Sequence, residues 1–412
     1  MKSPTLNLRT LLTSRRLRVH GLLIGVVFWS AYAWIMVVPG LRDRNGLLKG
    51  TDFLHYYVLG TLALEHQGAG LYDMDVQAEI AAERVPAAGH LVFLPLYGPQ
   101  ASLLFAPLAR LPYGSALTLW LAGSAVLYGL CCYAIWRTCL SLRAYRGITF
   151  ILAASYPAFV HLILWGQNSA LALGCFTLAY LALCSQKLFW AGLAIGCLAF
   201  KPQLAMAAVV IFLCTRQWKA LSGISAAAAA QLLVGWLYYG TAVMQDYAFH
   251  LFHVTEVYAL LEPRPYQTHS LRAFWAALIP WPAVAFALYL VTVTVALAVS
   301  VRYWRSSSPL SLQYSVLLVA TVLISPHLTV YDLVILVPAF LLIANWAVAH
   351  KDAPIASALG VLLYGGYVVP LTVPITQWTH VQISIPILAS VLWLVSRSEL
   401  RNATLGVTTS VA

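Results

Sequence analysis

The chain consists of apolar segments that follow one another with only short polar stretches between them. Hydrophobic residues occupy 61% of its 412 positions and charged residues only 9%, whereas a soluble domain carries about 25% charged residues. Backbone groups in hydrocarbon have to bond within their own segment, so apolar segments of this kind cross a bilayer as helices. We therefore expect an all-α, polytopic membrane protein that has the lipid bilayer as a partner.

Basic residues predict the orientation of the chain. Five Lys or Arg side chains lie within the first 18 residues, and the positive-inside tendency then places the amino terminus in the cytoplasm. Residues 19–38 cross outward, so residues 40–90 form an extracytoplasmic loop. The net charge of +11 is scattered between spans as orientation signals are, so we do not expect nucleic acid as a partner.

Residues 91–110 leave two topologies open, because this apolar segment contains three prolines. If it crosses, Arg137, Arg143 and Arg146 lie outside; if it re-enters and returns, they lie inside. We prefer the re-entrant topology, because it places every later basic cluster inside. It predicts about 12 transmembrane helices and two cytoplasmic termini. The other expected crossings are 114–136, 148–164, 169–184, 188–200, 203–214, 220–239, 282–301, 310–324, 328–346, 354–373 and 381–395.

The predicted organisation is one transmembrane domain, residues 1–401, followed by a short cytoplasmic tail, residues 402–412. A second large outer loop covers residues 240–281. In the first loop, residues 51–65 and 73–84 are expected to form two amphipathic helices at the membrane interface.

Acidic residues concentrate in the first outer loop, which holds seven of the 13 in the chain. If Asp52 begins a helix, His55 and Tyr56 lie three and four residues further on and share its face. A carboxylate, an imidazole and a phenol would then point the same way. Two interpretations of Asp52 remain open: it caps the helix, or it acts in catalysis.

A lysine is predicted below the outer membrane surface. Segments 188–200 and 203–214 are shorter than the roughly 20 residues that span hydrocarbon, and Lys201-Pro202 joins them. An ionisable residue at such depth suggests a functional site. The alternative is a lysine whose side chain extends to the interface.

Further polar residues are expected on the same, outer side. They include Gln167 and Asn168, the stretch 267–272, and Ser325-Pro326-His327. A transport pathway needs polar residues at mid-membrane and on both faces, so this one-sided arrangement favours an extracytoplasmic active site.

Two other motifs are weaker indications of a site. His250 and His253 are spaced for one helical face, but no third ligand follows at a fixed spacing, so no metal is expected. Asp73-Met74-Asp75 resembles the DxD motif of nucleotide-sugar transferases, or holds acids favoured at a helix amino terminus.

From residue 50 to about 338, the chain resembles the polyprenyl-phosphate-sugar-dependent glycosyltransferases of family 87, which include mycobacterial mannosyltransferases. The resemblance rests on short motifs in a common order and spacing. They are Gly50-Thr51-Asp52-Phe53, Leu71-Tyr72-Asp73, Pro107-Leu108 with Leu111-Pro112 before Trp120, Gly166-Gln167, Gly192 through Lys201-Pro202, and Ser325-Pro326.

This resemblance implies the GT-C fold and an inverting transfer of a sugar, typically mannose, from a polyprenyl-phosphate donor to an acceptor hydroxyl outside the cytoplasm. A glycolipid or glycan acceptor, a cell-membrane location and no cofactor are expected with it. Asp52 matches the aspartate that serves as general base. Lys201 first, then His327, Arg272 and Arg264, would bind the leaving phosphate, and His55, Tyr56, Gln167 and Asn168 would bind substrate. The alternatives are a lipid or solute transporter, or a lipid-linked oligosaccharide ligase or polymerase.

Overall fold

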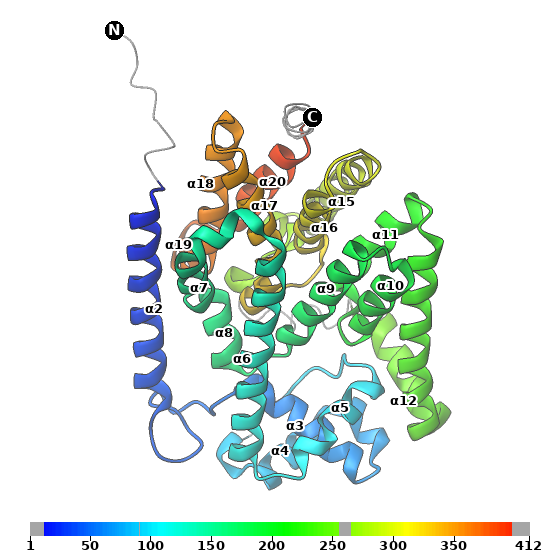
Figure 1. Cartoon of the computed structure of the whole chain (residues 1–412). Helices are drawn as coiled ribbons and strands as arrows, with labels where there is room; N and C mark the ends of the chain where they lie inside the picture. Colours follow the sequence, from blue (N-terminus) through cyan, green and yellow to red (C-terminus); the bar gives the residue numbers. More distant parts are fainter. Residues whose placement is uncertain (1–11, 90, 255–264, 398–412) are drawn as a thin grey trace.

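The computed structural model describes residues 12–89, 91–254 and 265–397. Within these ranges the chain is a bundle of helices without a β-strand (Figure 1). The α-helices are α2 (Ser14–Met36), α3 (Thr51–Leu64), α4 (Met74–Arg84), α5 (Pro99–Ala109), α6 (Tyr113–Thr138), α7 (Arg146–Ala154), α8 (Pro157–Trp165), α9 (Ser169–Cys184), α10 (Leu188–Gly196), α11 (Met206–Cys214), α12 (Trp218–Phe252), α14 (Leu271–Leu278), α15 (Pro282–Trp304), α16 (Leu310–Ile324), α17 (Val337–Ala349), α18 (Pro354–Val368), α19 (Val373–Thr379) and α20 (Ser384–Val395). The 3-10 helices are η1 (Gly68–Tyr72), η2 (Pro86–Ala88), η3 (Leu140–Tyr145), η4 (Cys197–Phe200), η5 (Pro202–Leu204), η6 (Pro265–Gln267), η7 (Val330–Leu336) and η8 (Val369–Thr372).

The helices confirm a multi-pass membrane protein. Seven helical segments of the described chain are long and apolar enough to cross a bilayer. They are Ser14–Met36, Tyr113–Thr138, Leu140–Trp165, Trp218–Phe252, Pro282–Trp304, Val330–Ala349 and Ile355–Thr379. Four shorter apolar helices are Ser169–Cys184, Leu188–Phe200, Leu310–Ile324 and Ser384–Val395. The total of 12 crossings stays a prediction.

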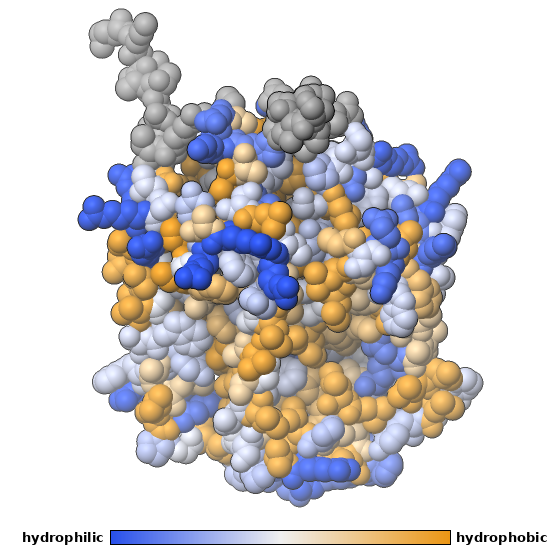
Figure 2. Space-filling model, in the orientation of Figure 1, coloured by the Kyte–Doolittle hydropathy of each residue, from blue (hydrophilic) through white to orange (hydrophobic). Residues whose placement is uncertain are grey.

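The bundle has two distinct ends. Helix α2 begins at one, here called the amino-terminal end, and α3, α4 and α5 lie at the other, the α3 end (Figure 1). Leu12, Tyr145 and Lys351 line one cavity, so η3 and the α17–α18 connection share the amino-terminal end with the start of α2. Hydrophilic residues gather toward both ends, with a more apolar zone between them (Figure 2).

Residues 91–110 do not carry the chain from one end to the other. Helix α5 lies against α3, where a Cβ on Gly60 would come within 2.6 Å of the carbonyl oxygen of Phe105. Helix α6 then starts from the α3 end and runs back toward the amino-terminal end (Figure 1). This arrangement agrees with the topology in which the segment returns to the side where it started.

The two helices expected in the first loop do form, but α3 is not an amphipathic surface helix. Eleven of its 14 residues, from Phe53 to Ala63, are buried. Apolar side chains occupy all of its faces, and a helix that is apolar all round packs inside a protein. Helices α4, α5 and α6 cover it, so α3 is the centre of a hydrophobic core of its own.

Two further segments differ from the predicted crossings. The expected span 148–164 is divided into α7 and α8 at Ser155-Tyr156-Pro157, because Pro157 begins a new helix and suits a first-turn position. Helix α12 continues past a kink at Gly240 to Phe252. The second outer loop, expected from residue 240, therefore starts with helix.

Helix α16 is the centre of the larger core. Twelve of its 15 residues are buried, and α11, α15, α17 and α20 pack around it. The short helices predicted on both sides of Lys201 are present as α10 with η4, and η5 with α11. They leave Lys201 inside the protein, where its side chain is buried.

Candidate active site

Two glycine turns bring Asp52 next to Gln167. Gly50 has a φ of 65° just before α3, and Gly166 has a φ of 72° at the end of α8. A Cβ on Gly166 would lie 2.8 Å from the Cβ of Phe53 and 3.6 Å from the Cα of Gly50. Both turns adopt the left-handed conformation that glycine accepts without strain, and their backbones touch. Asp52 lies two residues after Gly50, and Gln167 directly follows Gly166, so this contact brings their side chains close together.

Helix α6 holds both turns in place. The indole Nε1 of Trp120 donates a hydrogen bond of 2.8 Å to the carbonyl oxygen of Gly166. The hydroxyl of Tyr113 donates to the carbonyl oxygen of Gly50 at 2.9 Å. One helix thus fixes the positions of two segments that lie more than 100 residues apart in the sequence.

The side chain of Gln167 is fully engaged. Its Nε2 donates to Oδ2 of Asp52 at 2.7 Å and to the hydroxyl of Tyr331 at 3.0 Å. Its Oε1 accepts from the hydroxyl of Tyr56 at 2.6 Å and from the backbone N–H of Asn168 at 3.3 Å. A glutamine amide has two donor hydrogens and two acceptor positions, so all four are in use. Asp52 lies in the first turn of α3 behind Gly50, which takes the N-cap position.

Aromatic side chains cover the next part of the site. The hydroxyl of Tyr97 lies 3.0 Å from that of Tyr56 and accepts from Nδ2 of Asn168 at 3.3 Å. The ring of His55 stacks on Phe93 with centroids 4.8 Å apart. Burial lowers the pKa of His55 to about 3, so this imidazole is neutral at physiological pH. Nε2 of His55 and Oδ1 of Asn168 have no hydrogen-bond partner among the described residues.

Lys201 forms a buried ion pair. Its Nζ lies 2.7 Å from Oδ1 of Asp332, and the two side chains are 9% and 7% exposed. Nζ also donates to the hydroxyl of Ser169 at 3.3 Å and lies 5.6 Å from the centre of the Tyr331 ring. The backbone N–H and the hydroxyl of Thr329 donate to Oδ2 of Asp332 at 3.2 and 3.3 Å. A donor phosphate would therefore have to compete with the Asp332 carboxylate for the ammonium group of Lys201.

The stretch before α14 joins the site through its backbone. Thr268 forms an isolated antiparallel bridge with Thr329, and the N–H of His269 donates to the carbonyl oxygen of Leu328 at 2.7 Å. The imidazole of His269 is buried with Nδ1 3.0 Å from the hydroxyl of Ser384. Burial lowers its pKa to about 3. This stretch therefore supports η7, which carries Asp332, through neutral contacts.

Three predicted phosphate-binding residues are less closely defined. The hydroxyl of Ser325 donates to the carbonyl oxygen of His327 at 2.9 Å, which places His327 in the turn after α16. Arg272 is the second residue of α14 and lies within electrostatic reach of Tyr289. Arg264 lies outside the described residues. The roles of all three stay predictions.

The weaker motifs have local roles. Nδ1 of His250 bonds the carbonyl oxygen of Asp246 at 2.9 Å, and Nδ1 of His253 bonds that of Phe249 at 2.8 Å. Within the described ranges, no group of three or more His, Cys, Asp or Glu side chains is arranged to hold a metal ion. The carboxylate of Asp73 accepts from the first N–H groups of α4, as the helix-terminus interpretation predicts.

Sequence reasoning missed Tyr97, Tyr331 and Asp332. Asp332 lies inside the apolar run 328–346, which was expected to be a plain crossing. A carboxylate in such a run needs a partner, and this rule alone would have suggested Lys201. Tyr97 and Tyr331 carry no comparable signal, because tyrosines are frequent in membrane helices and their contacts depend on the fold.

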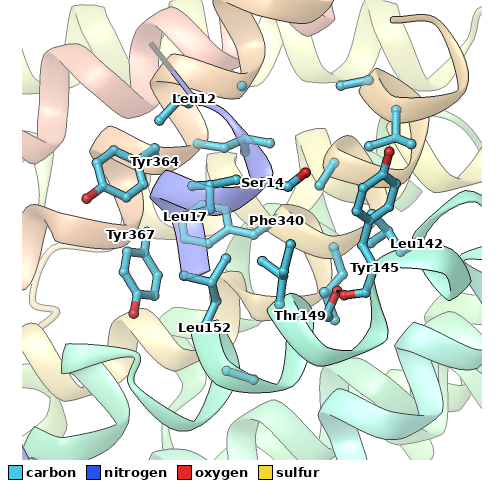
Figure 3. Close-up of a pocket in the computed structure, with 18 of the residues that line it drawn as sticks. Leu12, Ser14, Leu17, Leu142, Tyr145, Thr149, Leu152, Phe340, Tyr364 and Tyr367 are labelled. Carbon is cyan, nitrogen blue, oxygen red and sulfur yellow. Dashed lines mark hydrogen bonds between the residues drawn. The ribbon is translucent and has the colours of Figure 1, made fainter. Parts of the chain in front are cut away.

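A cavity of about 690 Å³ lies elsewhere, between α2, α7, α17 and α18. Apolar side chains and tyrosines such as Tyr145, Tyr364 and Tyr367 line it (Figure 3). It belongs to the amino-terminal end and contains none of the residues predicted for the site. The polar network around Asp52 is therefore the candidate active site.

Comparisons with known proteins place the chain in a family. The family model described as glycosyltransferase family 87 matches residues 95–326, a little more than half of the chain. This range includes Gln167 and Lys201 but neither Asp52 nor Asp332.

A curated relative is similar as well. The polyprenol-phosphate-mannose-dependent alpha-(1-2)-phosphatidylinositol pentamannoside mannosyltransferase of Mycolicibacterium smegmatis is 29% identical over 239 residues, which are 55% of this chain and 52% of that protein. The chain thus spans about half the length of the curated relative that it matches. No solved structure matches. With its family match over residues 95–326 and seven helices long and apolar enough to cross a bilayer among the described residues, the chain belongs to glycosyltransferase family 87.

Proposed function

We propose that this glycosyltransferase moves mannose from a polyprenyl-phosphate donor to a hydroxyl of a glycolipid or glycan, with inversion at the sugar carbon and with Asp52 as general base. The observation that carries the proposal is the pair of carboxylates in the network. Asp332 is balanced by Lys201 at 2.7 Å, whereas Asp52 is half-buried and receives its 2.7 Å hydrogen bond from a neutral amide. We therefore assign the proton-accepting role to Asp52, the more exposed of the two carboxylates.

The proposed reaction is a single displacement. The acceptor oxygen attacks the anomeric carbon as its proton passes to the Asp52 carboxylate. The bond between the anomeric carbon and the phosphate oxygen breaks, and the phosphate keeps the electron pair. One general base within reach of the acceptor hydroxyl is sufficient for such a step and typically contributes 10²–10⁴-fold in rate.

The donor assignment is supported by the name of the relative, which is polyprenol-phosphate-mannose-dependent. A leaving phosphate gains charge as the bond breaks and is stabilised by preorganised cations. We assign His327 and Arg272 to this role, with Arg264 as a further candidate and Lys201 as a cation shared with Asp332. His55 and Asn168 each have a buried polar atom without a protein partner and are the proposed contacts for sugar hydroxyls.

The proposed location is the cell membrane, with the site on the extracytoplasmic side and both termini in the cytoplasm. This proposal rests on the basic residues of the first 18 positions and on helix α3, which carries Asp52 and lies at the end opposite the start of α2 (Figure 1). A membrane-embedded lipid donor on that side makes a nucleotide sugar unnecessary.

The test is Asp52→Asn, assayed for transfer from polyprenyl-phosphate-mannose in detergent or vesicles. Asn still accepts a hydrogen bond from Gln167, so the protein should fold and bind donor while turnover falls about 10²–10⁴-fold. Asp73→Asn is the matched control, since Asp73 caps α4 and Asn caps equally well; its activity should be retained. Turnover near the wild-type rate in Asp52→Asn would exclude Asp52 as the base.

The donor class is tested separately with wild-type protein. Transfer from polyprenyl-phosphate-mannose supports the proposal, whereas transfer only from a lipid-linked oligosaccharide would identify a ligase or polymerase. Family membership already favours an enzyme over a transporter.

A further inference from the structure

We infer that Gln167 is a positioning residue that aims the Asp52 carboxylate and keeps it ionised, rather than a contact for the sugar. This inference rests on the proposed role of Asp52 as general base. The substrate-binding role that the sequence suggested for Gln167 requires a free donor or acceptor on its amide. The structure leaves none, because Asp52, Tyr331, Tyr56 and the N–H of Asn168 occupy all four positions.

The orientation of the amide follows from its neighbours. Burial raises the pKa of Tyr56 well above its usual value, and Tyr97 beside it raises the pKa further. Tyr56 therefore stays protonated and donates to Oε1 of Gln167. The other end of the amide, Nε2, then points at Asp52, which as a carboxylate can only accept hydrogen bonds. Flipping the amide would place Oε1 against that carboxylate.

The hydrogen bonds form a series in which every donor points toward Asp52. Nδ2 of Asn168 donates to the hydroxyl of Tyr97, and with Tyr56 donating to Gln167, the contact of 3.0 Å between the two phenols has Tyr97 as its donor. Gln167 donates in turn to Asp52 at 2.7 Å. Hydrogen bonds in such a chain polarise one another, and donation to a carboxylate favours its charged form. This series of hydrogen bonds therefore favours the charged form of the Asp52 carboxylate.

Other groups act on Asp52 from the surrounding elements. Tyr113 of α6, Tyr331 of η7, Lys201 and Tyr56 of α3 lie within electrostatic reach of it. The phenols are neutral, and the charge of Lys201 is balanced by Asp332. Gln167 donates a hydrogen bond directly to Asp52, and it can be replaced without changing the charge of any of these groups.

The experiment compares pH–rate profiles of the full-length protein with polyprenyl-phosphate-mannose as donor. Gln167→Glu places a second carboxylate against the first, and two carboxylates at one site raise the pKa of one of them. The acid limb of kcat/KM should then move upward by about one pH unit or more, which lowers the rate about tenfold on that limb. Gln167→Met removes the donor without adding charge, and it should move the limb less, in the same direction, with a lower kcat and a nearly unchanged KM for the donor.

Gln186→Glu is the matched control. Gln186 is exposed just beyond the far end of α9, the helix that Gln167-Asn168 precedes, so the same change adds the same charge away from Asp52. Its pH profile should superimpose on the wild type. Thermal midpoints of all variants verify folding, and Gln167→Met carries the test if Gln167→Glu does not fold.

The outcomes separate the two proposals. Wild-type pH profiles in both Gln167 variants, with Asp52→Asn inactive, would overturn the positioning role and leave Asp52 as the base. A raised donor KM with unchanged kcat in Gln167→Met would instead identify Gln167 as a sugar contact. An active Asp52→Asn would remove the base itself, whatever the Gln167 variants do.

Discussion

Replacing Lys201 by methionine separates a structural role from a donor-binding role. Met fills most of the space of the lysine stem but leaves the Asp332 carboxylate buried without its cation. Removing one partner of a buried pair costs about 3–5 kcal/mol. Asp332 keeps the hydroxyl of Ser169 and two donors from Thr329, so we expect a loss near the lower limit, about 3 kcal/mol.

This loss can be measured as a thermal midpoint. An unfolding entropy of about 2.1 cal/mol/K per residue over 412 residues corresponds to about 0.9 kcal/mol/K for the chain. A loss of about 3 kcal/mol then lowers the midpoint by roughly 3–4 °C, as measured by thermal unfolding in detergent. A midpoint equal to that of the wild type would refute the reasoning from the buried pair.

The double variant Lys201→Met with Asp332→Asn completes the test. Asn keeps the size of the aspartate and can still accept from Thr329, so the double variant should recover most of the lost stability. Donor affinity, measured with polyprenyl-phosphate-mannose, then decides the role of the lysine. Affinity that recovers with stability indicates a structural pair, whereas affinity that stays low in the stable double variant indicates that Lys201 binds the donor phosphate.

Three further predictions concern other parts of the molecule. Gly166→Ala introduces backbone strain at φ 72° and a contact of 2.8 Å between the new Cβ and Phe53. It should displace Gln167 and lower kcat about 10²-fold. An unchanged kcat would contradict the role of this turn. The pKa of His55 is about 3 in the folded protein, against 6.5 for an exposed histidine. Below about pH 6.5 the unfolded chain therefore binds a proton that the folded protein does not, and the free energy of unfolding should fall by up to about 1.4 kcal/mol per pH unit. His55→Phe should make the thermal midpoint less dependent on pH, and an equally steep dependence would argue against a neutral histidine. An Arg143→Cys variant without other cysteines should resist an impermeant thiol reagent applied from outside whole cells, and labelling there would reverse the proposed topology.

Hydrophobicity predicted the architecture because the bilayer allows few alternatives. Apolar length and the break at Lys201-Pro202 follow from local sequence. The break at Pro157 was not expected, although a proline suits the first turn of the new helix α8. The surface position expected for α3 was wrong for a tertiary reason. Its sequence contains enough polar atoms, in His55, Tyr56 and Thr61, to suggest an exposed face. However, neighbouring elements bury all three side chains, Gln167 accepts from Tyr56, and the backbone of α3 itself accepts from Thr61.

The site was predicted only in part, since its bonds join distant segments. Asp52 and Gln167 were each expected on the same side, yet nothing in either segment indicates that Gly50 and Gly166 touch. Lys201 was noticed through its depth, but the partner that balances it lies 131 positions later in the chain. Periodicity cannot give such a pairing, because it depends on how α9, α11 and η7 pack against one another.

The same separation of 131 positions has a consequence for how the protein is made. Synthesis proceeds at about 5–20 residues per second, so Asp332 is added about 7–26 s after Lys201. Throughout this interval the growing chain holds a lysine destined for the protein interior whose counter-ion has not yet been translated. The ion pair that joins the two short helices to η7 can therefore form only after η7 has been made.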